Sequence, residues 1–161
     1  MPDMLVHLLD LPDPSESYAA LSAEGILIHR PLASTKTRVL DWVKSHSTLS
    51  GANECEVCFS RLPVSCFIAS REGEVLGYAC YHATAPNFFG PTRVLETEQG
   101  KGIGKALLLA CLHAMRAEGY VYGIIGGVGP AEFYEKCVGA SLIPNSTPGI
   151  YRFRLKPPET P

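Results

Sequence analysis

A glycine-rich turn between a predicted strand and a predicted helix constrains this chain more than any other feature of its sequence. Residues 88–95 favour the strand, and residues 102–118 carry apolar side chains at helical spacing. Glycines let a backbone approach a ligand closely, and the first N–H groups of a helix have no partner within the helix. Together with the helix dipole, the charges of Lys101 and Lys105 predict a site for a phosphate or pyrophosphate. The turn consists of Gln99, Gly100, Lys101, Gly102, Ile103, Gly104 and Lys105.

Two well-known phosphate-binding loops do not fit the spacing of this turn. A Walker A loop has four residues between its glycines, followed by Lys and Ser or Thr. Here Gly100 and Gly104 enclose three residues, and Ala106 stands where the Mg²⁺-binding hydroxyl is needed. A dinucleotide fingerprint, Gly-x-Gly-x-x-Gly, is one residue longer than the run in this chain. A tight turn without a ligand is the alternative, and glycines alternating with lysines disfavour it.

The rest of the chain predicts an α/β fold with a mixed sheet, because strands and hairpins come first and strands then alternate with helices. The predicted strands are 4–11 (at an edge), 26–32, 64–69, 75–84, 88–95, 120–125, 140–143 and 150–155. The predicted helices are 18–24, 34–45, 102–118 and 130–138. Residues 45–60 are polar and are predicted as a loop with at most a short helical turn.

Composition excludes several classes of protein. The chain has 161 residues, 46% of them apolar, which is enough for one domain with its own core. Its formal charge is −2, so no basic excess favours binding to nucleic acid. The apolar runs are far shorter than the ~20 residues that cross a bilayer, and the first residues do not resemble a secretion signal. We therefore expect a cytoplasmic protein with no nucleic-acid or membrane partner; whether it forms a homodimer stays open.

The six cysteines predict no metal site. Cys55 and Cys58 have the spacing of half a zinc site or of a redox dithiol. A structural zinc takes four ligands, and no second pair follows in the sequence. The nearest histidines, His46 and His82, lack ligand spacing. We interpret the pair as two incidental thiols of a reducing compartment.

Two motifs resemble the GNAT N-acetyltransferase superfamily. Gln99-x-x-Gly102-x-Gly104 matches the family signature Gln/Arg-x-x-Gly-x-Gly/Ala. Residues 133–136, Phe-Tyr-Glu-Lys, resemble its second motif at the usual interval, although one extra residue precedes the glycine that follows. The resemblance implies a single-domain GNAT-like fold with a mixed, mostly antiparallel central sheet flanked by helices. It places the acetyltransferase domain at 25–156, an N-terminal extension packed on it at 1–24, and a flexible tail at 157–161.

The resemblance also implies an activity: transfer of an acetyl group from acetyl-coenzyme A (acetyl-CoA), as cosubstrate and without a metal, directly to a primary amine. The acceptor would be a small molecule, such as a metabolite or an amino sugar. A non-catalytic acyl-CoA-binding module is the alternative. Matched to the family motifs, the cofactor-binding residues are Val94, Leu95, Gln99, Gly100, Lys101, Gly102, Ile103, Gly104, Lys105 and Tyr134.

The same match gives Tyr134 the role of proton donor to the leaving thiolate, with core packing as its alternative. The general base is open. By the period of two along 75–84, Leu76, Tyr78, Cys80 and His82 share a face, and His82 at the strand end could accept a proton. Water, Glu54 and Glu56 are alternatives for the base, and the two glutamates could instead bind a cationic amine. The glycines of 126–129 could approach a substrate, or could serve only as a flexible lead into the next helix.

Overall fold

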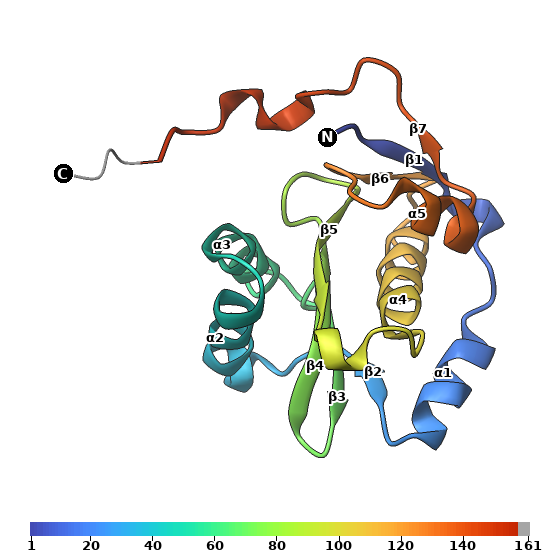
Figure 1. The fold of residues 1–161 in the computed structure, drawn as a ribbon, viewed down its shortest axis with the longest axis vertical. Coiled ribbons are helices and arrows are strands. Elements are labelled where there is room, and N and C mark those ends of the chain that lie inside the picture. Colours follow the sequence, from blue (N-terminus) through green and yellow to red (C-terminus); the bar gives the residue numbers. More distant parts are fainter. Residues whose placement is uncertain (158–161) are drawn as a thin grey trace.

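A computed structural model describes residues 1–157, which fold into one seven-stranded sheet with helices on both faces (Figure 1). The strands are β1 (Met4–His7), β2 (Leu27–His29), β3 (Cys66–Arg71), β4 (Glu74–Tyr81), β5 (Phe88–Val94), β6 (Tyr122–Ile125) and β7 (Ser141–Leu142). The helices are α1 (Ser15–Ala23), α2 (Lys36–His46), α3 (Leu49–Cys58), α4 (Ile103–Ala117) and α5 (Ala131–Val138). None of the helices in residues 1–157 is both long and apolar enough to cross a membrane.

The sheet is mixed and mostly antiparallel, which confirms the predicted fold class. Its strand order is β2-β3-β4-β5-β6-β1-β7, and β5 with β6 is the one parallel pair among the described strands. A parallel pair needs a crossover, and the chain between these two strands supplies α4 for it. That crossover brings the glycine turn to the end of β5.

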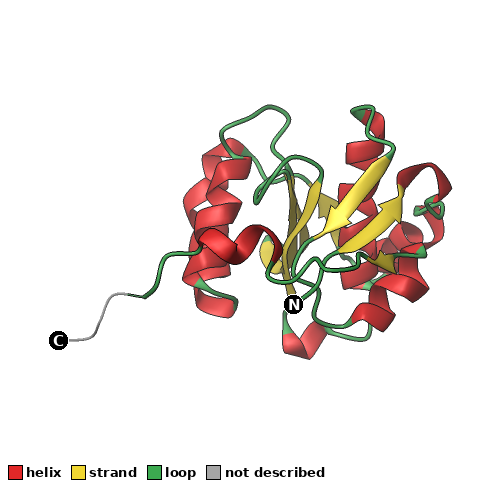
Figure 2. Ribbon diagram, turned by 90° about the horizontal axis from the view of Figure 1, so that it is seen from above, coloured by secondary structure: helices red, strands yellow, loops and turns green. Residues whose placement is uncertain are grey.

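Each face of the sheet has its own core (Figures 1 and 2). Helix α4 packs between α1 and α5 on one face, with the side chains of Leu107, Leu108 and Leu112 fully buried. Each such leucine contributes about 1.5–3 kcal/mol of burial free energy. Helices α2 and α3 cover the other face, where Val43 lies in a second, smaller core. The sheet is therefore buried on both sides, and a functional cavity has to open between its strands or at its ends.

Strand β4 does not keep the simple alternation that the sequence predicts. Leu76 packs in the core beneath α4, whereas Tyr78 and Cys80 pack beneath α2 and α3. The cause is a β-bulge, because the register with β3 skips Leu76. The prediction that these side chains share one face with His82 is therefore wrong for Leu76.

The predicted loop at 45–60 is wrong, because α3 occupies most of it. Thr48 caps this helix, its hydroxyl accepting a hydrogen bond of 2.9 Å from the N–H of Gly51. The buried positions, Gly51, Ala52, Cys55 and Cys58, have helical spacing. Their small side chains form a narrow stripe that packs the helix close to the sheet.

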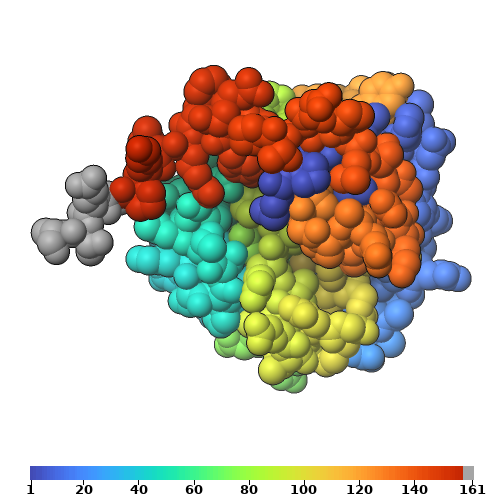
Figure 3. Space-filling view, turned by 45° about the horizontal axis from the view of Figure 1, so that its top comes forward, coloured from blue at the N-terminus to red at the C-terminus, as the bar shows by residue number. Residues whose placement is uncertain are grey.

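Both ends of the chain also differ from the prediction. β1 lies between β6 and β7, so it is not an edge strand, and it ends at His7. Residues 150–155 form no strand; a 3₁₀ helix, Gly149–Phe153, takes their place. Its apolar side chains are part of neither core of the described residues, and Phe153 is 84% exposed. Figure 3 shows this C-terminal segment (red) against the α2–α3 side of the molecule and above the N-terminus. Of the predicted tail, 158–161 lie outside the described residues.

Candidate active site

A cleft opens where β5 and β6 diverge. The two strands pair at Phe88–Ile124 and Phe89–Ile125, and beyond Phe89 the register between them ends. β5 continues to Val94 paired with β4 alone, so its other backbone edge borders a cavity of about 580 Å³. The glycine turn, the first turn of α4, and Pro130, Phe133 and Tyr134 complete the walls of this cleft.

The turn presents backbone donors to the cleft. Gly100 and Gly102 have φ values of +82° and +88°, a left-handed conformation that glycine adopts without strain. The N–H groups of Ile103, Gly104 and Lys105 have no partner within the helix, and no side chain of residues 1–157 caps them. A Cβ on Gly104 would lie 3.7 Å from Phe133 and 3.8 Å from Val94, two cleft-lining side chains. These features fit an anionic ligand whose chain runs along β5.

The structure brings eight of the ten predicted cofactor residues to the cleft; Leu95 and Lys101 do not line it. The Lys101 ammonium lies 2.7 Å from Glu98, and Arg71 also pairs with that carboxylate. The hydrogen bond from Lys101, followed by that from Arg71, lowers the pKa of Glu98. The Lys101 ammonium is therefore engaged by Glu98, and Lys105 is the lysine that lines the cleft.

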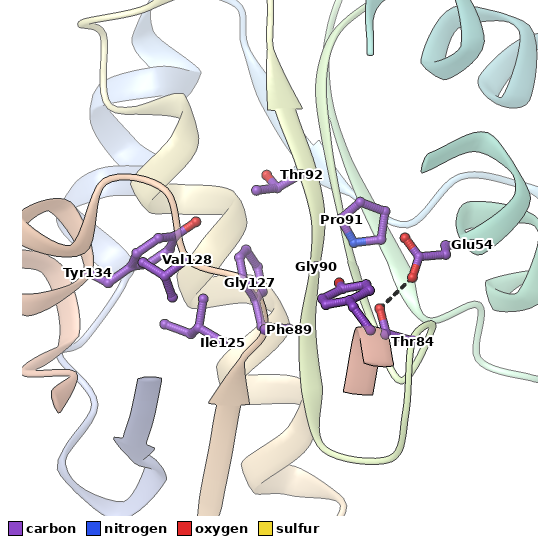
Figure 4. A pocket seen from close by; sticks show the side chains of 12 residues that line it. Glu54, Thr84, Phe89, Gly90, Pro91, Thr92, Ile125, Gly127, Val128 and Tyr134 are labelled. Atoms are coloured by element: carbon purple, nitrogen blue, oxygen red, sulfur yellow. Dashed lines mark hydrogen bonds between the residues drawn. The ribbon is translucent and has the colours of Figure 1, made fainter. Parts of the chain in front are cut away.

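A second cavity of about 270 Å³ meets the cleft at Phe89, Thr92 and Tyr134. It passes β5 at Gly90 and Pro91, and Figure 4 shows Tyr134 on one side of this strand and Glu54 with Thr84 on the other. Its remaining walls are Ile125, Gly126, Gly127, Val128 and Tyr151. The two cavities thus reach the same tyrosine from opposite faces of the sheet.

Tyr134 stands where the two cavities join. Its ring is 8% exposed and packs edge-on against Phe89 and Phe133, with centroids 6.2 and 5.1 Å away. Within residues 1–157 no protein group forms a hydrogen bond with its hydroxyl, and burial raises its pKa. The phenol therefore stays protonated at neutral pH. The packing role and the cleft-facing role predicted for this residue coexist.

His82 lies outside both cavities. It follows β4 with φ +57°, and its side chain is 4% exposed. Its Nε2 lies 3.0 Å from Glu118, and its Nδ1 accepts a 2.9 Å hydrogen bond from the Asn87 N–H. Burial outweighs the Glu118 contact and lowers the pKa of His82. The structure thus does not bring this predicted base to Tyr134.

We expect His82→Asn to leave kcat/KM for acetyl transfer within about twofold of the wild type, since the imidazole faces neither cavity. Asparagine tolerates the left-handed backbone. The loss of the hydrogen bonds to Glu118 and Asn87 should lower the free energy of unfolding by about 1–2 kcal/mol. Steady-state kinetics and urea unfolding test both points, and a large fall in kcat at unchanged stability would restore His82 as the base.

Three buried thiols lie together beneath α3, but they are not the predicted pair. The Sγ atoms of Cys55, Cys66 and Cys80 are all within 4.8 Å of one another, and Cys58 is not in the group. Hydrogen bonds from the other two thiols lower the pKa of Cys55. The hydrogen bond with Cys55, followed by burial, raises the pKa of Cys66, and burial above all raises that of Cys80.

We expect the purified protein to hold no stoichiometric zinc. A structural zinc takes four ligands, and the cluster found in residues 1–157 offers three thiols and no fourth ligand. Metal analysis by mass spectrometry, on protein prepared without chelators, tests this. One zinc per chain, lost in Cys66→Ala, would contradict it.

Sequence reasoning missed several residues that line the second cavity: Thr84, Phe89, Thr92 and Tyr151. They come from three separate segments, a loop, β5 and the C-terminal 3₁₀ helix, and no local pattern connects these segments. The sequence did contain one signal for helix α3. Thr48 is of a residue type that commonly caps the start of a helix, and small residues, beginning with Gly51, follow it. That helix would have placed Glu54 on a packed element rather than in a solvated loop.

The chain belongs to the acetyltransferase (GNAT) family. The family model "Acetyltransferase (GNAT) family" matches residues 35–140, well over half of the chain, and the matched range includes both motifs and the cleft. A comparison with curated proteins gave no match.

Solved structures share this fold at low identity. A GCN5-related glucosamine N-acetyltransferase region of a fungal multi-domain GH3 β-N-acetylglucosaminidase superposes with a TM-score of 0.72 at 14% identity, covering 88% of this chain and 19% of that one. A GNAT family acetyltransferase from Brucella melitensis, solved with acetyl-CoA, gives 0.56 at 17%, covering 73% and 86%. A GCN5-related N-acetyltransferase from Sphaerobacter thermophilus gives 0.51 at 16%, covering 88% and 48%. This chain thus spans a fifth of the fungal protein and about half of the Sphaerobacter protein.

Proposed function

We propose that this protein is an acetyl-CoA-dependent N-acetyltransferase that acetylates the primary amine of a small molecule. The observation that carries the proposal is the meeting of two cavities at Tyr134. The larger cavity has the unpaired strand edge and uncapped helix start that suit an extended, anionic cofactor. The smaller cavity reaches the same tyrosine from the other face, so two substrates can meet there without sharing a channel.

The cofactor would be held mainly by the backbone. N–H groups of Gly104 and Lys105 would bind its pyrophosphate, with the Lys105 side chain adding positive charge. The free edge of β5 near Val94 would pair with the pantetheine arm as an added strand. Gln99 donates a 3.3 Å hydrogen bond to the Val94 carbonyl and thereby ties the turn to this edge. The thioester would then lie beside Tyr134.

Transfer would be direct. The neutral amine nitrogen bonds to the thioester carbonyl carbon, and the carbon–sulfur bond breaks. Tyr134 gives its proton to the departing thiolate, and the phenolate recovers a proton from the acylated nitrogen. In a cleft with little water a thiolate is poorly solvated, so a nearby donor lowers the barrier.

A panel of amines tests the proposal. Glucosamine belongs in it because the fungal structure is described as a glucosamine N-acetyltransferase region; alkylamines, amino acid amides and arylamines complete it. We expect free coenzyme A to appear only when both acetyl-CoA and a suitable amine are present, with the acetylated amine identified by mass spectrometry. Binding of acetyl-CoA without turnover of any amine would support the non-catalytic acyl-CoA-binding module instead.

A further inference from the structure

The second cavity has a single carboxylate in its walls. Glu54 is the one acidic or basic residue among those that line it, and the others are apolar, hydroxyl-bearing or glycine. A cavity lined by one carboxylate and no cationic side chain attracts a cation and repels an anion. The chemistry of the wall therefore bears on which amines can enter.

Helix α3 and Thr84 orient the Glu54 side chain. Its Oε1 accepts a 2.7 Å hydrogen bond from the Thr84 hydroxyl (Figure 4). None of the ion pairs within residues 1–157 includes Glu54, so its charge is not balanced by a neighbouring lysine or arginine. Glu56, two residues further along α3, differs: it is 54% exposed, pairs with Lys36 at 2.8 Å, and does not line the cavity. Glu54 thus lines the cavity without an ion-pair partner, whereas Glu56 lies outside the cavity and has one.

The C-terminal 3₁₀ helix adds a wall beside Glu54. Tyr151 lines the cavity, and burial followed by the negative charge of Glu54 raises the pKa of its hydroxyl. Beyond Glu54 a further groove of about 280 Å³ continues past Tyr151 to Arg154. The carboxylate therefore stands at the junction of this outer groove with the cavity that leads to Tyr134.

We propose that Glu54 determines acceptor specificity by binding an ammonium group of the substrate other than the nitrogen that is acetylated, so that the enzyme acts on alkylamines with a second, charged amino group in preference to amines without one. This inference rests on the proposed acetyltransferase function. A carboxylate oxygen not engaged by Thr84 can accept a hydrogen bond from an ammonium group, and such charge-assisted bonds are stronger than neutral ones. Glu54 acts in binding, so its effect falls on KM rather than on kcat.

Glu54→Gln is the direct test, because glutamine keeps the shape and can still accept the hydrogen bond from Thr84. The probe is the alkylamine with a second amino group that the wild type acetylates fastest. We expect KM for this amine to rise about ten- to hundredfold with kcat within about threefold. For aniline, which is uncharged at neutral pH, KM (or its inhibition constant, if it is not acetylated) should stay unchanged. Glu56→Gln is the matched control and should behave as the wild type.

A second measurement needs no variant. Raising the salt concentration should raise KM for the alkylamine in the wild type and have less effect in Glu54→Gln. The thermal shift given by acetyl-CoA should be the same in both, which shows that the fold and cofactor cleft are intact. An unchanged KM in Glu54→Gln, or equal losses for alkylamine and aniline, would overturn the specificity role alone. A wild type that acetylates no amine would overturn the proposed function itself.

Discussion

Tyr134→Phe is expected to lower kcat for amine acetylation by about 10²–10⁴, or roughly 3–5 kcal/mol of barrier. The variant keeps the ring, and with it the edge contacts to Phe89 and Phe133, but removes the proton donor. Because the hydroxyl bonds to no protein group within residues 1–157, its loss should leave the melting temperature nearly unchanged. Burial raises the pKa of Tyr134 above its ordinary value near 10, so the wild-type donor is available at every pH at which the assay is practical.

Tyr78→Phe is the matched control for this prediction. It also removes a buried tyrosine hydroxyl, but Tyr78 lies in the core beneath α2 and α3 and lines neither cavity. Its kcat should equal that of the wild type. Single-turnover kinetics measure the chemical step directly. A fall of less than about threefold in that step for Tyr134→Phe would remove the general-acid role, and a loss of stability would favour core packing instead.

The part of the site that was predictable from the sequence is the part that is local. Strand β5, the glycine turn and α4 follow one another within 30 residues, and each carries its own signal: β-type residues, alternating glycines, an apolar stripe. Because a strand followed by a tight turn and a helix has few possible geometries, Gly102, Gly104 and Lys105 could be placed beside one ligand. In the structure these three residues line the same cleft.

The acceptor side could not be predicted in this way. Glu54, Thr84 and Tyr151 come from α3, a loop and the C-terminal 3₁₀ helix, and only the tertiary fold brings them to one cavity. The position of His82 relative to the cavities could not be predicted for a related reason. His82 was placed by counting alternate residues along β4, but that strand ends at Tyr81 and the left-handed backbone at His82 turns the chain away. Non-local packing and single backbone irregularities leave almost no trace in sequence patterns.

The order of the strands in the sheet could not be predicted from local patterns either. β1 has the composition of a short apolar strand, and nothing in four residues specifies whether such a strand lies at an edge or between two partners. In the fold, the N-terminus is held in place by contacts more than a hundred residues away. Asp3 accepts a 2.9 Å hydrogen bond from the N–H of Gly127, which lines the second cavity, and its own N–H donates to Ser146 at 2.8 Å. The first residues of the chain thereby help to shape the acceptor side.

Gly104→Val is expected to abolish the rise in melting temperature that acetyl-CoA gives the wild type. A ligand at a hundredfold excess over its Kd stabilises the native state by about 2.7 kcal/mol, which for a domain of this size is a shift of roughly 5–10 °C. Valine at this position would point its methyl groups between Val94 and Phe133, where the cofactor is proposed to lie. Gly104 has an ordinary helical backbone, and a Cβ there would meet Phe133 and Val94 at ordinary contact distance, so the variant without ligand should be nearly as stable as the wild type.

Two further variants make the Gly104→Val result specific. Gly104→Ala adds a single carbon at ordinary contact distance and should keep part of the shift. Gly129→Ala adds the same carbon to a glycine whose Cβ would meet nothing within 4 Å and which lines neither cavity, so the full shift should remain. Differential scanning fluorimetry with and without acetyl-CoA measures all three. A shift in Gly104→Val equal to that of the wild type would mean that the first turn of α4 does not hold the pyrophosphate, since a branched side chain there would block its approach to the N–H groups.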